Sequence, residues 1–341
     1  MNKIRHDISR IRVAIVSIVA GLLILGLKWI AYNLTGSSAL KSDALESIVN
    51  VVAACFALGA LIFADQPADK DHPYGHGKIE FFSAAFEGGL ISLAAILIIF
   101  DAGKTLYEGA HLMQLEKGLG INLVAGLLNG LLGWYLVRRG KQTHSEALTA
   151  DGQHVLSDFY TTLGLLAGLC LVWITGYHWL DPVIALGVGL MLVRTGFKLV
   201  SKSADALLDK QDLTLLGQIV GLIESTKPKE IIALHEMRAM RSGHHSHIDV
   251  HVVVPEYFTI AKAHDLVEFY GESIIKQAGI SGEFHSHVDP CGRLYCASCD
   301  LSECKIRTEP LKSAFKVNIE TVQQLGHNHS SAETASVSVN G

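Results

Sequence analysis

Residues 37–50 read SSALKSDALESIVN, and residues 145–158 read SEALTADGQHVLSD. The two stretches carry Ser, Ala, Leu and Asp at matching positions, and polar residues follow each Asp by three and seven positions. Because residues three, four and seven apart share a face of a helix, these polar side chains form one stripe in each stretch. Both stretches lie in long apolar surroundings. The sequence therefore predicts two related helices with a polar face inside an apolar protein.

The composition indicates a membrane protein. Only 18% of the 341 residues are charged, against about 25% in ordinary soluble proteins, and the mean hydropathy is +0.32. A helix needs about 20 mostly apolar residues to cross a membrane. Such segments occupy residues 13–34, 39–64, 80–105, 118–138, 145–175 and 179–200. We expect an all-α domain of six transmembrane helices over residues 13–208, preceded by a basic N-terminus, residues 1–12.

The distribution of Lys and Arg predicts an orientation. Basic residues flank the spans at the N-terminus and near residues 70–78, 138–141 and 198–202, whereas the opposite connections carry little beyond Lys117. The positive-inside rule then places both termini in the cytoplasm. The repeated stretches run in opposite directions through the membrane, as in the inverted repeats of transporters, whose sites lie near the midplane. We expect a multi-pass protein of a bacterial inner membrane.

Polar residues four apart occur in each repeat: Glu46 and Asn50 in the first, His154 and Asp158 in the second. One interpretation is a polar seam that joins two helices, but Ser or Asn would suffice for that role. An ionised carboxylate at a helix centre costs about 2.5–3.5 kcal/mol even on lenient scales, and this cost favours a functional site. Carboxylate, amide and imidazole groups are ligands of divalent cations. The stripes therefore predict a metal site inside the membrane.

With these residues in place, the sequence resembles the cation diffusion facilitators, which are dimeric exchangers of divalent metal ions and protons. The stretch ADGQHVLSD (150–158) is similar to the zinc-type version of the family's fifth span. The resemblance implies a transport site made of Glu46, Asn50, His154 and Asp158. The family usually has two Asp, or a His and an Asp, where this chain has Glu and Asn. The neutral Asn oxygen makes the site harder, so manganese, iron(II), cobalt and nickel are alternatives to zinc, our first expectation.

Two further acids belong to the repeat. Asp43 and Asp151 lie about one turn before the presumed ligands. They either orient the ligands and accept protons, or they cap and pair near helix ends. The sequence leaves both alternatives open.

The connection DKDHPYGHGK (69–78) between the second and third spans holds a second group. A short polar loop can carry histidines without binding anything. The spacing DxxHxxxH is nevertheless typical of metal ligands, and it resembles the family's loop site. The resemblance implies that Asp69, His72 and His76 bind a metal ion there.

Residues 209–290 have the pattern of a small α+β domain. Residues 214–225 and 261–279 have helical periodicity, while residues 230–243, 245–255 and 282–290 alternate as strands do. The order αββαβ predicts a small sheet with two helices on one side. The family's cytoplasmic domain has a metallochaperone-like fold of this kind. Because residues 209–290 can bury only a modest core, we expect a homodimer to stabilise the domain.

Histidines are dense in this domain. The resemblance assigns a cytoplasmic metal site to five residues: His235, His251, His264, His287 and Asp289. In a strand, His287 and Asp289 project to the same face because they are two positions apart. For four other histidines we expect ordinary surface positions: His244, His245, His247 and His285.

Four cysteines follow in CGRLYCASCDLSEC (291–304), at Cys291, Cys296, Cys299 and Cys304. In a reducing cytoplasm this spacing suits a zinc site rather than disulfides, although its first part also mimics a ferredoxin pattern. We expect a metal role for this Cys-rich extension, residues 291–322. The Ser- and Ala-rich tail, residues 323–341, lacks periodicity and is expected to be disordered.

These features predict a secondary transporter, not an enzyme, that exports a divalent transition metal from the cytoplasm while protons enter. The partners we expect are metal ions, protons, the lipid bilayer and a second copy of the chain. No basic patch with interleaved aromatic residues indicates nucleic acid. Two alternatives remain, a membrane-anchored metal sensor that signals through its His/Cys domain and a passive channel.

Overall fold

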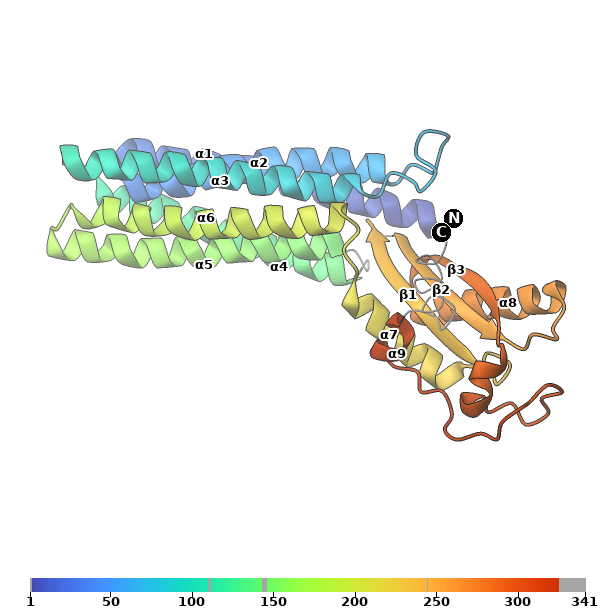
Figure 1. Ribbon diagram of the computed structural model, residues 1–341. Coiled ribbons are helices and arrows are strands. Elements are labelled where there is room, and N and C mark those ends of the chain that lie inside the picture. Colours follow the sequence, from blue (N-terminus) through green and yellow to red (C-terminus); the bar gives the residue numbers. More distant parts are fainter. Residues whose placement is uncertain (1, 110–111, 143–145, 244, 325–341) are drawn as a thin grey trace, which may run out of the picture. The chain divides into compact units, whose positions relative to one another are not determined.

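The computed structural model describes residues 2–109, 112–142, 146–243 and 245–324 (Figure 1). The chain forms two compact units. The first, the helical unit, comprises Met1–Pro67 and Ile79–Asp205, and the second, the sheet unit, comprises Ala68–Lys78 and Ala206–Gly341. Each unit is described separately below. His244 and all but the first two residues of the expected tail, residues 323–341, lie outside the described residues.

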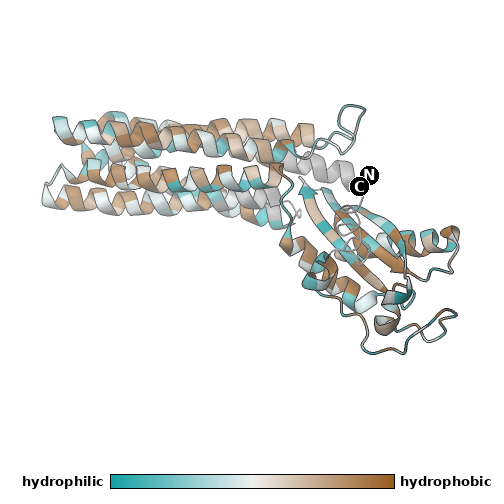
Figure 2. Ribbon diagram, viewed as in Figure 1, coloured by the Kyte–Doolittle hydropathy of each residue, from teal (hydrophilic) through white to brown (hydrophobic). Residues whose placement is uncertain are grey.

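Long helices make up the helical unit, and they lie side by side in Figure 1. They are α1 (Asn2–Thr35), α2 (Ser38–Ala64), α3 (Ile79–Glu108), α4 (Leu115–Gln142), α5 (Glu146–Thr175) and α6 (Leu180–Leu207). In the described chain, six helices are long and apolar enough to cross a membrane. Hydrophobic residues are frequent along these helices in Figure 2. The six expected spans are confirmed. One difference is that α1 begins at Asn2, so most of the basic N-terminus is helical.

Helices α4 and α5 pack closely because small residues line their contact. A Cβ on Gly152 would lie 2.6 Å from the backbone nitrogen of Val137, and one on Gly133 would lie 2.9 Å from the nitrogen of Leu156. Such contacts exclude any larger side chain, and close approach through glycine is common between membrane helices. The Gly of the second repeat therefore sets how near α5 comes to α4.

Asp181 joins the start of α6 to the start of α2. Its fully buried carboxylate accepts hydrogen bonds from the backbone N–H groups of Ser38 (2.7 Å) and Ala39 (3.2 Å) and from the hydroxyl of Ser37 (2.5 Å). The first N–H groups of a helix have no partners within the helix and carry a partial positive charge. Asp181 therefore fixes the end of α2, the helix that carries the first repeat.

The sheet unit has the expected αββαβ order, which confirms the predicted fold class. Its elements are α7 (Leu213–Thr226), β1 (Ala233–Ser242), β2 (His245–Val254), α8 (Ile260–Ala278) and β3 (Ser281–Pro290), followed by a 3-10 helix, η1 (Arg293–Ser298), and α9 (Ile319–Gln323). Strand β2 is central, antiparallel to β1 and parallel to β3. Apolar residues of α7, α8 and the strands form the core, with Leu215, Ile248 and Ile274 fully buried.

The connection of residues 68–78 packs within the sheet unit rather than with the helices that it joins. Lys78 forms an ion pair with Asp209, at 2.8 Å, and the Tyr74 ring contacts His247 edge-on. A Cβ on Gly77 would lie 2.2 Å from the carbonyl oxygen of Ser242, so only glycine fits beside the end of β1.

Candidate functional site

Three of the four predicted transport ligands meet between α2 and α5. The Asn50 amide donates a hydrogen bond of 2.5 Å to Asp158 Oδ2, and its Oδ1 lies 3.3 Å from His154 Nε2. His154 Nε2 is 4.0 Å from Asp158 Oδ2. Asp158 is buried and His154 is half-buried. The two helices thus bring together an amide, an imidazole and a carboxylate, although Asn50 and Asp158 are 108 positions apart in the chain.

Glu46 and Glu87 add two carboxylates to this neighbourhood. Glu46 is buried on α2, and its strongest charge interaction is with Asp158, followed by Asp43, Lys28 and His154. Glu87 Oε1, on α3, lies 3.7 Å from His154 Nε2. The sequence analysis did not assign Glu87 to the site, although an acid in an apolar span is a signal of function. We refer to Glu46, Asn50, Glu87, His154 and Asp158 together as the bundle site.

The spacing of the bundle site is close to that of a metal-ligand shell. Ligand atoms about 2.1 Å from an ion lie roughly 3.0–3.4 Å apart at octahedral or tetrahedral angles. The distance from His154 to Asn50 falls in this range, and those to Glu87 and Asp158 exceed it by less than 1 Å. Among the described residues, the sets of three acidic, His or Cys ligand atoms that lie within 4.8 Å of one another are all in the sheet unit. The side chains of the bundle site would therefore move closer together to hold an ion.

The two other acids of the repeat have different surroundings. Asp43 forms a buried ion pair with Lys28 of α1, at 2.7 Å, and also accepts hydrogen bonds from Asn122 (2.9 Å) and Thr162 (3.0 Å). These contacts support the pairing alternative for Asp43. Asp151 accepts a hydrogen bond of 3.3 Å from Ser17. The sequence analysis did not assign a role to Lys28. Its position as a lone basic residue within the apolar span of residues 13–34 could have indicated that it needs an acidic partner.

The loop residues converge as the sequence predicted. His76 Nε2 lies 3.1 Å from His72 Nδ1 and 3.4 Å from Asp69 Oδ2. The backbone N–H groups of His72 and Asp71 donate to Asp69 Oδ1, and the His72 bond in particular lowers the pKa of the Asp69 carboxyl. An ionised carboxylate beside two imidazoles is a geometry that can hold a divalent ion.

Four of the five predicted cytoplasmic ligands also converge, on β1, β2 and β3. Asp289 Oδ2 lies 2.9 Å from His251 Nδ1 and 3.3 Å from His235 Nε2, and Asp289 Oδ1 lies 4.0 Å from His287 Nε2. His251 and His287 line an open surface hollow of about 450 Å³. The strands thus present a group of nitrogen and oxygen ligands that ions can reach from outside.

Glu236 belongs to this group, and His264 does not in the described structure. The β1–β2 pairing is irregular between His235 and Arg238, and Glu236 has a positive φ of 53°. Its carboxylate lies 3.7 Å from His235 Nδ1 and 3.8 Å from His251 Nε2. Strained backbone of this kind is often found at functional sites. His264 is exposed on α8, so its predicted role stays a prediction.

A further group lies where the sequence analysis expected only surface histidines. His247 is 4% exposed, and its Nδ1 lies 2.6 Å from Glu283 Oε1. His245, His247 and Glu283 each offer a ligand atom within 4.8 Å of the others. Burial opposes ionisation of Glu283, but hydrogen bonds from His285 and His247 outweigh it and lower the pKa of this carboxyl. The expectation of a surface position is wrong for His247, which is buried and contacts both Glu283 of β3 and the Tyr74 ring.

Comparisons with known proteins agree with this arrangement. Residues 14–208 match the model of the cation efflux transmembrane domain, and residues 213–291 match that of the cation efflux protein cytoplasmic domain. The chain belongs to the cation efflux family, the cation diffusion facilitators. It is thus a multi-pass membrane protein of a transporter family rather than an enzyme.

Relatives of this cation efflux protein share most of its length. An uncharacterised transporter of Synechocystis is 39% identical over 81% of this chain and 89% of its own. The manganese efflux system protein MneP of Bacillus subtilis is 26% identical over 84% of this chain and 97% of its own. The cation-efflux pump FieF of Yersinia pestis is 27% identical over 79% of this chain and 89% of its own.

The match of this cation efflux protein to the family's cytoplasmic domain ends at residue 291, where the Cys-rich extension begins. The extension continues through η1 and ends near α9 in the described chain. Cys291, Cys296 and Cys299 are buried, and Cys304 is half-buried. All four cysteines lie in the sheet unit, and Cys296, Cys299 and Cys304 lie beyond the residues that the family model covers.

Proposed function

We propose that this protein exports a divalent transition-metal ion from the cytoplasm in exchange for protons, and that it works as a homodimer. The observation that carries the proposal is the bundle site. Asn50, His154 and Asp158 meet between helices of apolar composition, where charged groups are costly unless they have a function.

Competition between metal and protons supports the exchange. A carboxylate or an imidazole binds metal only through a lone pair that carries no proton. Asp158, Glu46, Glu87 and His154 therefore release protons when an ion binds and take them up when it leaves. Asn50 does not titrate and contributes only its amide oxygen. The same atoms then bind both substrates, and no separate device is needed to couple the two fluxes.

The donor set favours a harder ion than zinc. The bundle site offers three carboxylates and one amide oxygen beside a single imidazole. Oxygen ligands suit manganese, whereas imidazole suits zinc, iron and nickel. We place manganese(II) and iron(II) ahead of zinc, our first expectation, and the similarity to a manganese efflux protein supports manganese.

Direction and regulation follow from the charge distribution and from the sheet unit. The basic flanks support a cytoplasmic location for both termini and the sheet unit, where the sites of the sheet unit would meet cytoplasmic metal. Metal at Asp69, His72 and His76, and at the group around Asp289, would then report the cytoplasmic metal load. Rocking of helices around the bundle site would give alternating access.

The test is metal-driven proton flux in proteoliposomes that contain a lumenal pH dye, with manganese, iron(II), cobalt, nickel and zinc added in turn. Asp158→Asn keeps the side-chain shape but removes the charge, so we expect flux to be lost. Glu116→Gln, an exposed acid in the first turn of α4, is the matched control and should retain flux. Unchanged flux in Asp158→Asn would refute the site.

The same vesicles distinguish the alternative functions. A passive channel would carry metal without responding to a proton gradient. A membrane-anchored sensor would keep its signalling when Glu46, His154 and Asp158 are all replaced. Either result would overturn the proposed exchange.

A further inference from the structure

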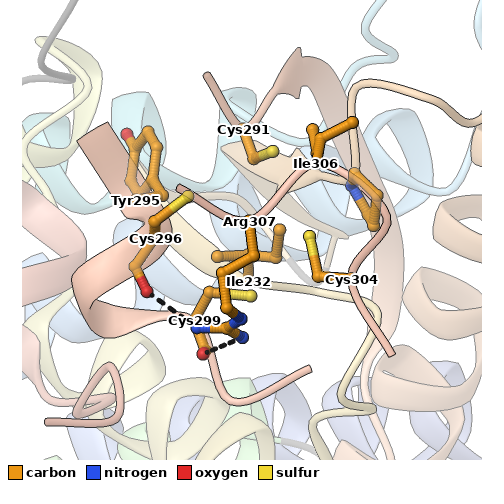
Figure 3. A pocket seen from close by; sticks show the side chains of 9 residues that line it. Ile232, Cys291, Tyr295, Cys296, Cys299, Cys304, Ile306 and Arg307 are labelled. Atoms are coloured by element: carbon orange, nitrogen blue, oxygen red, sulfur yellow. Dashed lines mark hydrogen bonds between the residues drawn. The ribbon is translucent and has the colours of Figure 1, made fainter. Parts of the chain in front are cut away.

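The Cys-rich extension contains a small cavity that the proposed transport does not use. All four of its cysteines line this cavity, together with Arg307 and four other side chains (Figure 3). Cys291 follows β3, Cys296 lies in η1, Cys299 ends η1, and Cys304 lies in the irregular segment beyond. Residues spread over fourteen positions thus face one space.

The size of the cavity limits what it can hold. Its volume is about 10 Å³, which is close to the smallest space that accommodates a single water molecule. An organic ligand cannot enter a space of this size, whereas a metal ion can. Cysteines that only pack in a core have no reason to surround one shared cavity, as these four do.

Hydrogen bonds from Arg307, Thr308 and later backbone groups hold the backbone around the cavity in place. The Arg307 guanidinium donates hydrogen bonds to the carbonyl oxygens of Cys296 (3.1 Å), Cys299 (2.9 Å) and Leu301 (2.8 Å). The Thr308 hydroxyl donates to the Cys296 sulfur at 3.5 Å. Between η1 and α9 the described chain has no other helix or strand. Segments with so little regular structure are commonly stabilised by a metal or by disulfides.

Two cations lie near the sulfurs. Four thiolates around a divalent ion carry a net charge of −2, which needs compensation. Arg307 lines the cavity, and Lys227 is close enough to Cys299 to interact electrostatically with it. Both cations would offset the charge of a tetrathiolate centre.

We propose that Cys291, Cys296, Cys299 and Cys304 bind one zinc ion, which fastens the extension to the sheet unit. Thiolates are soft ligands, and a closed set of four is typical of structural zinc. In the described structure no three of the sulfurs lie within 4.8 Å of one another, whereas sulfurs around zinc are about 3.8 Å apart. Zinc binding therefore draws the four cysteines together and tightens the extension. Cys291 and Cys299 already pack against Ile232 and Val253, so the tightened extension rests on β2.

Cobalt(II) provides a selective probe in the full-length protein in detergent under reducing conditions. Thiolate ligands give cobalt a strong charge-transfer absorption in the near ultraviolet, which His and carboxylate ligands do not. We expect this band to saturate at one cobalt per chain and to disappear in the double variant Cys296→Ser/Cys299→Ser. The double variant His235→Ala/His251→Ala is the control and should keep the band.

Alkylation tests the site without any substitution. Zinc should protect the four cysteines of the extension, and a chelator should expose them, as read by mass spectrometry. Cys55 and Cys170, on α2 and α5, serve as internal references that zinc should not protect. Absence of the cobalt band, its persistence in the Cys variant, or equal alkylation with and without zinc would overturn the proposal. None of these results bears on transport through the bundle site.

Discussion

Replacing Lys28 with Met should destabilise the helical unit, because it leaves the Asp43 carboxylate buried without its cation. The two charged atoms are 2.7 Å apart, and the side chains are 1% and 2% exposed. Removing one partner of a buried pair costs about 3–5 kcal/mol. Asn122 and Thr162 still donate to Asp43, and each such hydrogen bond contributes about 1 kcal/mol. We therefore expect a loss near the lower end, about 3 kcal/mol.

The assay is unfolding of the purified protein in mixed detergent micelles, with a double-mutant cycle. Asp43→Asn alone strands the Lys28 cation and should also be destabilising. The double variant Lys28→Met/Asp43→Asn removes both charges, so it should recover about 2 kcal/mol relative to the sum of the single changes. Lys41→Met is the matched control, because its pair with Asp101 has the same 2.7 Å distance but is about 30% exposed. That change should cost less than about 1 kcal/mol.

Two results would refute this reasoning. One is a Lys28→Met cost no larger than that of Lys41→Met, and the other is strict additivity in the cycle. Transport adds a second readout, since a purely structural pair predicts that the double variant retains metal-driven proton flux. A stable double variant without flux would instead place Asp43 on a proton path.

Three further predictions concern other contacts. Glu87→Gln should weaken metal binding by the bundle site about tenfold, measured as the metal concentration for half-maximal flux, and an unchanged value would remove Glu87 from the site. Glu236→Gln should lower zinc affinity at the cytoplasmic group about 10-fold or more, measured by calorimetry on the full-length protein, whereas equal affinity would mean that the positive φ has no role in binding. Burial opposes ionisation of Asp212, but the N–H of Leu215 and the Arg241 guanidinium outweigh it and lower the pKa of this carboxyl. Its ionised form therefore stabilises the fold above the unfolded pKa of about 4, and this contribution is lost as the pH falls through the lower folded pKa. Asp212→Ala should cost about 1 kcal/mol at neutral pH and less at low pH, in thermal unfolding curves, and a constant difference would contradict the assignment.

The bundle site shows how far helical periodicity alone can lead. Residues four apart on one helix share a face, so Glu46 and Asn50, and likewise His154 and Asp158, were paired from the sequence. Which helix brings a further ligand is not a local property. Glu87 reaches His154 only because α3 packs beside α2, and no spacing within the chain encodes that contact.

The sheet unit gives the same lesson at two residues. Alternation predicted β1 and β2, but strict alternation turns Glu236 away from His235, and only an irregular pairing with a positive φ brings it back. His247 looked like a surface residue because its own strand is polar at that point. The residues that contact it, Glu283 of β3 and Tyr74 of the connection before α3, are far from it in the sequence.

The sequence by itself determined the six spans, the αββαβ order and the residue types that can bind metal, because hydropathy and periodicity are properties of neighbouring residues. Tertiary structure alone decided which acids lie in the bundle site and which form an ion pair. Asp43 and Glu46 are three residues apart on α2, yet Asp43 contacts Lys28 whereas Glu46 lies near His154 and Asp158. The difference arises because a buried charge takes whichever partner packing places beside it.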